Sequence, residues 1–273
     1  MKRLLPLVAV AALGSTLAAC GGGGGGGSSN PTTTASSVPN PIVWCVDTTY
    51  PPAESIVNGK AAGYDIDIAN AISKQLGSTA QIKTTGFTVI IPALKQKKCN
   101  AIISSMTITP ERAKQVHFSP YLDVGTFLMV KKGNPSNVTD VASLSGKSAA
   151  VEAATTQLAA LQAENKTLQK QGKPQITIKS YPADTSAAAA IQAGKVDAYL
   201  ADATPVLYYI RTTGGKFETA GKQVGIAPEG VATRIGDPLG AQINNAIQAL
   251  YLNGKMKTIL AKWQAAQFAL KSQ

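Results

Sequence analysis

The 273-residue sequence has one histidine, three cysteines, few aromatic residues and no apolar run long enough for a membrane-spanning helix. His117 has no cysteine or second histidine at the spacing of metal ligands. Neither a serine–histidine–aspartate triad nor a glycine-rich phosphate loop can be assembled from the remaining residues. We therefore predict no metal site, no cofactor and no catalytic centre of these kinds.

Acidic residues are also scarce. The chain has 15 of them against 26 lysines and arginines, which gives a net charge of +11. The basic residues are spread along the chain, and no aromatic side chains are interleaved with them as on nucleic-acid-binding surfaces. The excess of basic residues therefore indicates a solvated surface, and nucleic acid is not a predicted partner.

The N-terminus has the pattern of a bacterial export signal. A basic start, Met1–Arg3, precedes the apolar segment Leu4–Leu17, which is too short to cross a bilayer as a stable helix. The LAAC that ends at Cys20 resembles a lipobox, which implies removal of residues 1–19 and acylation of this cysteine. The alternative is an ordinary secretory signal with a chance cysteine. Residues 20–41, rich in Gly, Ser, Thr and Pro, are predicted to form a flexible tether.

The segment Asn100–Arg112 has the features of a ligand site. Its apolar run Ala101–Ile103 is typical of a buried parallel strand. Pro110 suits the first turn of a helix, and Arg112 follows it. Helix N-termini and guanidinium groups both favour carboxylates, so the junction predicts a site for a small carboxylate. The alternative is an ordinary helix start with a solvated arginine. Four hydroxyls lie between strand and helix: Ser104, Ser105, Thr107 and Thr109.

A second apolar strand, predicted at Ile42–Tyr50, also ends in polar residues. Between the two strands, apolar residues recur at helical spacing over Gly63–Gly77, with Asp65 as the expected N-cap and Gly77 as the C-cap glycine. Both polar ends fall at the carboxyl ends of predicted parallel strands. This is the edge at which open α/β sheets bind ligands.

The runs DTTYPPAES, GYDIDIANAISKQLG and SSMTITPER resemble family 3 of the bacterial extracellular solute-binding proteins, the amino-acid receptors of ABC importers. The resemblance extends from Ile42 to Gln264. It implies an α/β, type II periplasmic-binding-protein fold, in which two lobes are joined by two hinge strands and enclose a ligand cleft. It also implies a monomer in the periplasm or on the outer face of the cytoplasmic membrane, with an amino acid and a membrane permease as partners.

The same resemblance divides the chain into lobes. Residues 42–130 and 223–273 are predicted to form the first lobe and residues 131–222 the second, with crossings at Lys131–Lys132 and Gly230–Thr233. Further predicted elements are the strands Ser148–Glu152 and Val196–Ala201 and the helices Pro238–Asn253 and Lys255–Leu270.

The resemblance further implies a clamp for the backbone groups of an amino acid. Arg112 is expected to hold the carboxylate, together with Thr107 and the backbone amides of Thr155 and Thr156, and Asp202 to hold the α-ammonium. The alternative for the last three residues is simple N-capping of helices. Two hydroxyls of the first loop, Ser104 and Ser105, complete the clamp.

Side-chain specificity is expected from four positions. Tyr50 and Phe87 match family positions that sandwich the ligand side chain, and aromatic faces favour cations. The alternative for both is a plain core residue. Asp47 matches an acid that binds a distal amine or amide, and Glu152 adds a second negative charge if it points inward. We therefore predict a basic ligand (arginine, lysine or ornithine), with glutamine or another polar neutral amino acid as the next choice. Acidic ligands are disfavoured by repulsion.

Cys45 and Cys99 are the two cysteines left after Cys20 is assigned to lipid. In an oxidising compartment such a pair usually forms a disulfide. Their different distances from the ends of their strands place the α-carbons near the limit for bridging, so this possible disulfide is left open.

Two other classes of protein use this type of scaffold. A periplasmic enzyme such as a cyclohexadienyl dehydratase, acting on prephenate or arogenate, needs a general acid in the cleft, for which Glu152 or Asp202 could serve. A sensory module needs a membrane span and an output domain, for which the sequence after residue 19 has no pattern. Arg112 paired with Asp202 suits a zwitterion and favours a binding protein, not an enzyme.

Overall fold

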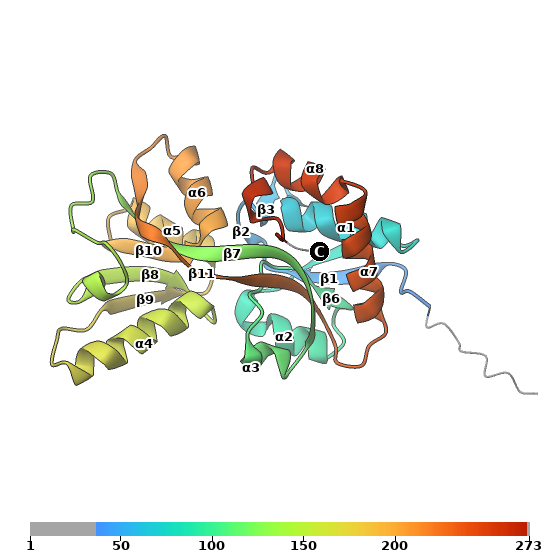
Figure 1. Cartoon of the computed structure of the whole chain (residues 1–273), viewed down its shortest axis with the longest axis horizontal. Helices are drawn as coiled ribbons and strands as arrows, with labels where there is room; N and C mark the ends of the chain where they lie inside the picture. Colours follow the sequence, from blue (N-terminus) through green and yellow to red (C-terminus); the bar gives the residue numbers. More distant parts are fainter. Residues whose placement is uncertain (1–36, 272–273) are drawn as a thin grey trace, which may run out of the picture. The chain divides into compact units, whose positions relative to one another are not determined.

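The computed structural model describes residues 37–271 (Figure 1). The predicted signal peptide, Cys20 and most of the predicted tether lie outside the described residues. None of the helices between residues 37 and 271 is long and apolar enough to cross a membrane.

Eight strands form one mixed sheet in the order β5-β1-β6-β11-β7-β10-β8-β9. Strands β5, β1 and β6 are parallel at one end, and β10, β8 and β9 are parallel at the other. Between them, the long strands β7 and β11 pair in antiparallel fashion. The bounds are β1 Ile42–Val46, β5 Ala80–Thr84, β6 Ala101–Ile102, β7 His117–Lys131, β8 Ser148–Glu152, β9 Thr177–Tyr181, β10 Ala198–Asp202 and β11 Phe217–Thr233. A separate small sheet contains β2 Thr49–Tyr50, β3 Glu54–Val57 and β4 Lys60–Ala62.

Each set of parallel strands has its own helices and its own buried core (Figure 1). We call β1–β6 with α1, α2, α3, α7 and α8 the first half, and β8–β10 with α4, α5 and α6 the second half. Trp44 and Ile243 lie in the core of the first half, and Val151 and Leu161 in that of the second. The predicted α/β class is confirmed. The helices are α1 Tyr64–Gln75, α2 Phe87–Lys95, α3 Pro110–Ala113, α4 Thr156–Lys170, α5 Asp184–Gln192, α6 Ala203–Thr212, α7 Leu239–Leu252 and α8 Lys255–Lys262, with short 3-10 turns at Ala142–Leu144 and Ala266–Phe268.

Helix α1 shows how the sequence positions the site. It begins after Gly63, where an added Cβ would lie 1.9 Å from the carbonyl oxygen of Ala53, so only glycine fits. It ends before Gly77, whose φ of +69° is typical of a C-terminal glycine. The prediction of Asp65 as N-cap is wrong, because Gly63 is the N-cap and Asp65 is buried inside the first turn. Its carboxylate accepts hydrogen bonds from the Ser105 N–H at 2.8 Å and the Tyr121 hydroxyl at 3.0 Å.

The two long strands connect the halves at positions other than those predicted. On β7, residues 126–129 pair with β10 of the second half, whereas residues 117–120 pair with the part of β11 that lies beside β6. The crossings therefore fall near residues 121–125 and 225–230. The predicted crossings differ from these, because Lys131 ends β7 beyond its pairing with β10, and Gly230–Thr233 lie where β11 already runs beside β6 of the first half.

Several predicted elements differ in their bounds from the observed ones. Ile42–Tyr50 is divided into β1 and β2, and Val196–Ala201 becomes β10. The predicted helix Lys255–Leu270 ends at Lys262, because Gln264 has a positive φ of 57° that an α-helix does not allow. The indole of Trp263 in this turn donates to Asp67 Oδ2 at 2.7 Å, which attaches the turn to α1.

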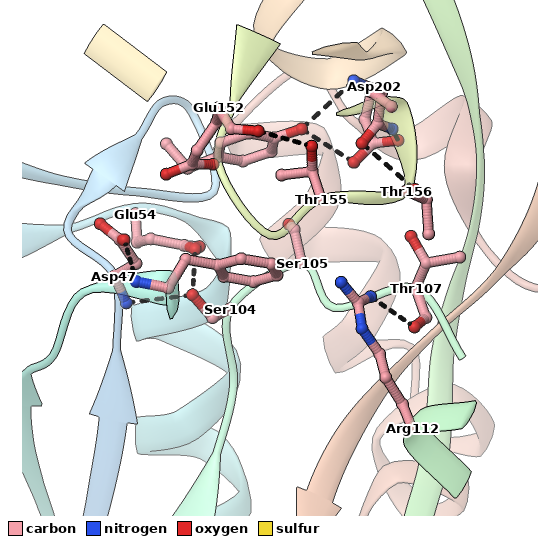
Figure 2. A pocket seen from close by; sticks show the side chains of 13 residues that line it. Asp47, Glu54, Ser104, Ser105, Thr107, Arg112, Glu152, Thr155, Thr156 and Asp202 are labelled. Carbon is pink, nitrogen blue, oxygen red and sulfur yellow. Dashed lines mark hydrogen bonds between the residues drawn. The ribbon is translucent and has the colours of Figure 1, made fainter. Parts of the chain in front are cut away.

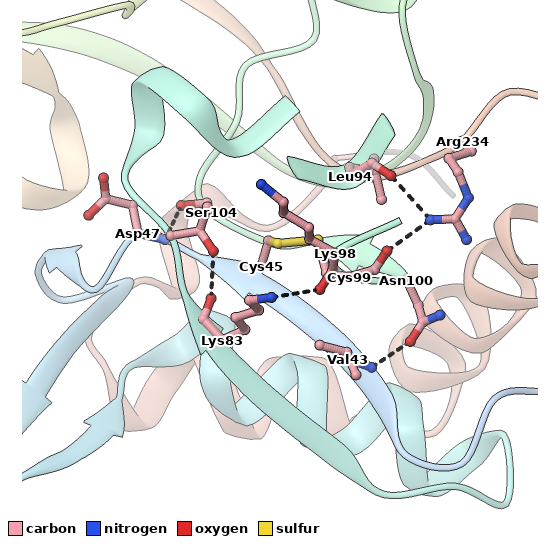
Figure 3. The surroundings of a disulfide bond; sticks show 11 residues. Val43, Cys45, Asp47, Lys83, Leu94, Lys98, Cys99, Asn100, Ser104 and Arg234 are labelled. Carbon is pink, nitrogen blue, oxygen red and sulfur yellow. Dashed lines mark hydrogen bonds between the residues drawn. A yellow bond between two sulfur atoms is a disulfide. The ribbon is translucent and has the colours of Figure 1, made fainter. Parts of the chain in front are cut away.

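Cys45 and Cys99 form a disulfide in the first half (Figure 3). Cys45 lies opposite Ile102 in the sheet, three residues beyond Cys99. The chain turns before β6, and this brings the two α-carbons to 5.7 Å. The turn is also held by Asn100 Oδ1, which accepts from Val43 N at 2.8 Å, and by Arg234, which donates to the Cys99 carbonyl at 2.8 Å.

Candidate functional site

A pocket with about 290 Å³ of space not filled by protein atoms, open solvent included, lies at the carboxyl ends of the parallel strands, between the two halves (Figure 2). All ten residues predicted to bind the ligand line this one pocket. They are Asp47, Tyr50, Phe87, Ser104, Ser105, Thr107, Arg112, Thr155, Thr156 and Asp202.

Three more residues line the pocket: Glu54, Glu152 and Gln157. Of these three, only Glu152 was considered in the sequence analysis, as a second negative charge if its side chain points inward. Gln157 is in the first turn of α4, directly after the two predicted threonines. Its place at the same helix end is the feature of the sequence from which it could have been predicted. Glu54 follows a pair of prolines and has no sequence signal of its own.

Arg112 supplies the positive charge of the pocket. It is placed by α3, whose N-cap Thr109 accepts a hydrogen bond from the Arg112 backbone N–H at 3.2 Å. Its guanidinium donates to the Thr107 carbonyl at 2.8 Å and, from the other half, to the Ala154 carbonyl at 3.1 Å. It also lies 5.3 Å from the centre of the Phe87 ring. A guanidinium has five N–H donors, so donors remain for an anion in the pocket.

No carboxylate forms an ion pair with Arg112 within residues 37–271. Burial lowers the pKa of Arg112, and the charges of Asp202 and Glu229 oppose this shift. A half-buried guanidinium with carbonyls as its partners keeps its charge and is suited to a carboxylate ligand.

Asp202, at the end of β10, is one of two buried acids of the second half that line the pocket, and Glu152 on β8 is the other. It stands at the N-cap position of α6, but its side chain makes no capping hydrogen bond, so the alternative N-capping role is not observed. Its carboxylate instead accepts from the Tyr50 hydroxyl at 2.8 Å and from Gln157 Nε2 at 2.6 Å. Burial raises the pKa of Asp202, while these two hydrogen bonds and Arg112 limit the rise.

The start of α4 faces the same pocket. The Thr155 hydroxyl accepts from the Leu158 N–H at 3.2 Å and donates to the Glu152 carbonyl at 2.8 Å, so its side chain does cap the helix. The first backbone N–H groups of a helix have no partner within it and attract anions. Ala154 adopts a left-handed φ of +62° in the turn before them.

The loop after β6 is fixed by hydrogen bonds from beneath the pocket. Ser104 Oγ donates to Glu54 Oε1 at 2.8 Å and accepts from the Asp47 N–H at 3.0 Å. Ser105 has a positive φ of 38°, and its hydroxyl lies 2.9 Å from that of Tyr64. Hydrogen bonds to other residues of the first half therefore fix the positions of the two serines.

The end of the pocket away from Arg112 is acidic (Figure 2). Asp47 accepts from the Thr49 hydroxyl at 2.8 Å and from the Phe87 N–H at 2.6 Å, so it caps α2. Burial raises the pKa of Asp47 despite these bonds. Glu152 is buried, and its Oε1 has no hydrogen-bond partner. Burial, followed by the nearby charges of Asp184 and Asp47, raises the pKa of Glu152 to about 10.

Within residues 37–271, no group of three or more His, Cys, Asp or Glu side chains has an arrangement that could hold a metal ion. The pocket offers groups for hydrogen bonds and ion pairs: a guanidinium at one end, a carboxylate beside it and further carboxyls at the other end.

The comparison with known proteins gives relatives that cover most of the chain. The ABC transporter arginine-binding protein 1 of Escherichia coli (strain K12) is 31% identical over 233 residues, which cover 80% of this chain and 88% of that protein. The L-cystine-binding protein TcyJ of the same strain is 28% identical over 224 residues, which cover 81% of each.

Solved structures agree with this fold. An ancestral arginine-binding protein bound to arginine has a TM-score of 0.75 and 33% identity, and the match covers 82% of this chain and 98% of that one. The ancestral amino acid-binding protein AncCDT-1, a precursor of cyclohexadienyl dehydratase, has a TM-score of 0.73 and 30% identity, covering 82% and 95%. The periplasmic two-lobed architecture implied by the sequence is confirmed.

The family described as bacterial extracellular solute-binding proteins, family 3, matches residues 42–266, which is most of the chain. With the relatives above, this match confirms the resemblance seen in the sequence: the chain belongs to family 3 of the bacterial extracellular solute-binding proteins.

Proposed function

We propose that this protein is the substrate-binding component of an ABC-type amino-acid importer, which captures a polar amino acid and delivers it to a membrane permease. The observation that carries the proposal is the presence of Arg112 and Asp202 in one pocket of about 290 Å³. A guanidinium and a carboxylate in the same pocket complement the carboxylate and the ammonium group of a zwitterion. The family and the names of the relatives support the same function.

In this proposal Arg112 binds the ligand carboxylate with the N–H groups at the start of α4. Thr107 takes part from the first half, and Thr155 and Thr156 from the second. Asp202 binds the α-ammonium, since a carboxylate with two hydrogen bonds still has lone pairs to accept further N–H donors. Ser104 and Ser105 shape the pocket between these groups.

The proposed ligand is a basic amino acid, and a polar neutral one such as glutamine is the next choice. The acidic end of the pocket supports a cation, because Asp47 and Glu152 both line it and no lysine or arginine does so there. Tyr50 and Phe87 offer aromatic faces to a long side chain. Relatives named for arginine support this choice, whereas a relative named for cystine shows that the family is broader.

The remaining parts of the proposal concern location and movement. The protein is proposed to have two lobes that close on the ligand. One lobe contains residues 42–130 and 223–273 and the other residues 131–222, except that β7 and β11 extend through both. The protein is proposed to be a monomer outside the cytoplasm that is attached to the membrane through an acylated Cys20, which lies outside the described residues.

A thermal-shift screen of residues 20–273 against the twenty common amino acids and ornithine tests this function. A ligand present at a hundred times its Kd stabilises the folded protein by about 2.7 kcal/mol. We expect one or a few basic or polar amino acids to raise the Tm clearly, and aspartate and glutamate to have no effect. If no amino acid changed the Tm, the proposal would be wrong.

An enzyme on the same scaffold is the second candidate, and one observation favours it. Glu152 is a buried carboxyl with a raised pKa in the pocket, as a general acid requires, and one structural neighbour is a precursor of cyclohexadienyl dehydratase. Incubation with prephenate or arogenate and measurement of carbon dioxide release separates the two functions. Turnover that is lost in Glu152→Gln would establish the enzyme, and its absence favours the transport protein.

A further inference from the structure

Two acids that line the pocket, Glu54 and Glu152, each have a buried oxygen without a hydrogen-bond partner, but the other oxygen of Glu54 accepts from Ser104. Asp47 accepts three hydrogen bonds, from the N–H and hydroxyl of Thr49 and from the Phe87 N–H. Asp202 accepts from Tyr50 and Gln157. Glu152 is 4% exposed, lines the pocket, and has no hydrogen bond to its Oε1.

The charges of the described residues that act most strongly on Glu152 come from acids, and the backbone N–H of Asp184 donates to it. Asp47 faces it from the end of β1, Asp184 from the start of α5 and Asp202 from the end of β10. The phenols of Tyr199 on β10 and Tyr209 on α6 lie within electrostatic reach. The charge of Arg112 acts on Asp202, on Glu229 and on Tyr50. A second, third or fourth carboxylate in such a space is strongly disfavoured unless a cation accompanies it.

We propose that Glu152 sets the ligand specificity of this pocket by proton exchange: its carboxyl keeps a proton while no ligand is bound and releases it when the cationic end of a basic amino acid binds there. This inference rests on the proposed function and names the group that selects the side chain. The O–H bond of Glu152 breaks, the proton passes to solvent, and the carboxylate accepts an N–H from the ligand cation. No other bond changes.

The protonation of Glu152 is not expected to change when a neutral amide ligand binds. Protonated Glu152 donates a hydrogen bond to an amide oxygen and therefore keeps its proton. Because burial and the neighbouring acids raise the pKa of Glu152 to about 10, the binding of a cation is opposed at low pH and favoured as the pH rises. Glutamine binding has no such dependence. The ratio of affinities for a basic and a neutral ligand therefore changes with pH.

Titration calorimetry with arginine tests the inference. Titrations at pH 7 in phosphate, imidazole and Tris, which differ in ionisation enthalpy, give the number of protons released per ligand. We expect about one proton for the wild type, and an affinity for arginine that rises about tenfold from pH 7 to pH 8. Glu152→Gln should bind arginine without releasing a proton and without this rise. The control Glu164→Gln changes a glutamate on α4 outside the pocket and should match the wild type.

Three outcomes contradict parts of the argument in different ways. Arginine binding with no proton release in the wild type, or with equal release in Glu152→Gln, overturns the proton exchange but leaves the receptor function intact. Proton release on glutamine binding also overturns it. Binding of glutamine with no binding of arginine, lysine or ornithine overturns the proposed basic ligand, and the exchange with it.

Discussion

The Tyr50 hydroxyl donates a hydrogen bond to Asp202 Oδ2 at 2.8 Å, between residues that are 152 positions apart in the sequence. Tyr50 belongs to the first half and Asp202 to the second, so this bond connects the two halves across the pocket. Arg112 makes a second such connection to the Ala154 carbonyl. The side chains proposed to hold the ligand therefore also hold the halves together.

The change Tyr50→Phe should favour separation of the halves, because it removes a hydrogen bond to a charged group worth about 1.5–3 kcal/mol. We expect small-angle scattering to give a larger radius of gyration for the ligand-free variant than for the ligand-free wild type. Saturating ligand should bring both to the same smaller value, since the ligand contacts both halves. Tyr251→Phe is the control, because that hydroxyl donates to the Tyr121 carbonyl on β7 and does not line the pocket. Equal radii for all ligand-free and ligand-bound samples would disprove hinged closure.

Loss of either charge of the proposed clamp should abolish ligand binding. Truncation of one partner of a buried charge pair costs several kcal/mol, because the other is left uncompensated. We expect Arg112→Ala and Asp202→Ala each to weaken binding at least a hundredfold in calorimetry while the circular dichroism spectrum is unchanged. Arg211→Ala is a matched control, since that guanidinium lies over the Tyr208 ring outside the pocket. If Arg112→Ala or Asp202→Ala bound within about threefold of the wild type, less than 1 kcal/mol, the assignment would be wrong.

The sequence predicted which residues meet in the pocket because they stand at the carboxyl ends of strands. Asp47, Arg112 and Asp202 each follow a short apolar run, and such runs in an α/β fold converge at one edge. The strand pattern indicated the shared edge for the ends of Ile42–Tyr50 and Ala101–Ile103, whereas Asp202 was placed in the site by the family resemblance.

The acids beneath the pocket could not be recognised in the same way. Asp65 in the first turn of a helix has the same sequence pattern whether it caps that helix or turns inward. Its true partners, Ser105 and Tyr121, lie 40 and 56 residues away. The crossings were misplaced because only the pairing partners of β7 and β11 show where one half ends.

Removal of the disulfide should destabilise the first half. The bond between Cys45 and Cys99 closes a long loop, with a sequence separation of 54 residues, and such a bond typically contributes about 2–4 kcal/mol. We expect the free energy of unfolding of Cys45→Ala/Cys99→Ala to be lower than that of the oxidised wild type by that amount. The variant should therefore unfold at a lower denaturant concentration. A reducing agent should lower the wild-type midpoint and leave that of the double variant unchanged. A wild type whose midpoint does not respond to reduction would show that the bond contributes nothing to stability.

Glu54 and Asp65 form a buried pair of carboxyls under the pocket. Both are 0% exposed. Glu54 Oε1 accepts from Ser104, and Asp65 Oδ2 accepts from Ser105 and Tyr121. Their other oxygens, Glu54 Oε2 and Asp65 Oδ1, have no N–H or O–H donor from any other described residue. A hydrogen bond between the two carboxyls requires that one of them keeps its proton, and burial beside Asp65 raises the pKa of Glu54 well above its usual value.

This pair makes stability depend on pH in a defined direction. A carboxyl whose pKa is raised on folding holds its proton in the folded state and loses it in the unfolded one. Its contribution is complete below the unfolded pKa of about 4.3 and falls as the pH rises towards the folded pKa, by at most about 1.4 kcal/mol per pH unit. Glu54→Gln removes this titration and keeps a donor for Asp65. We expect urea unfolding between pH 5 and pH 8 to show a shallower decline of the unfolding free energy for Glu54→Gln than for the wild type. Glu164→Gln, outside the pair, should decline as the wild type does, and parallel curves for all three proteins would show that Glu54 does not carry the shared proton.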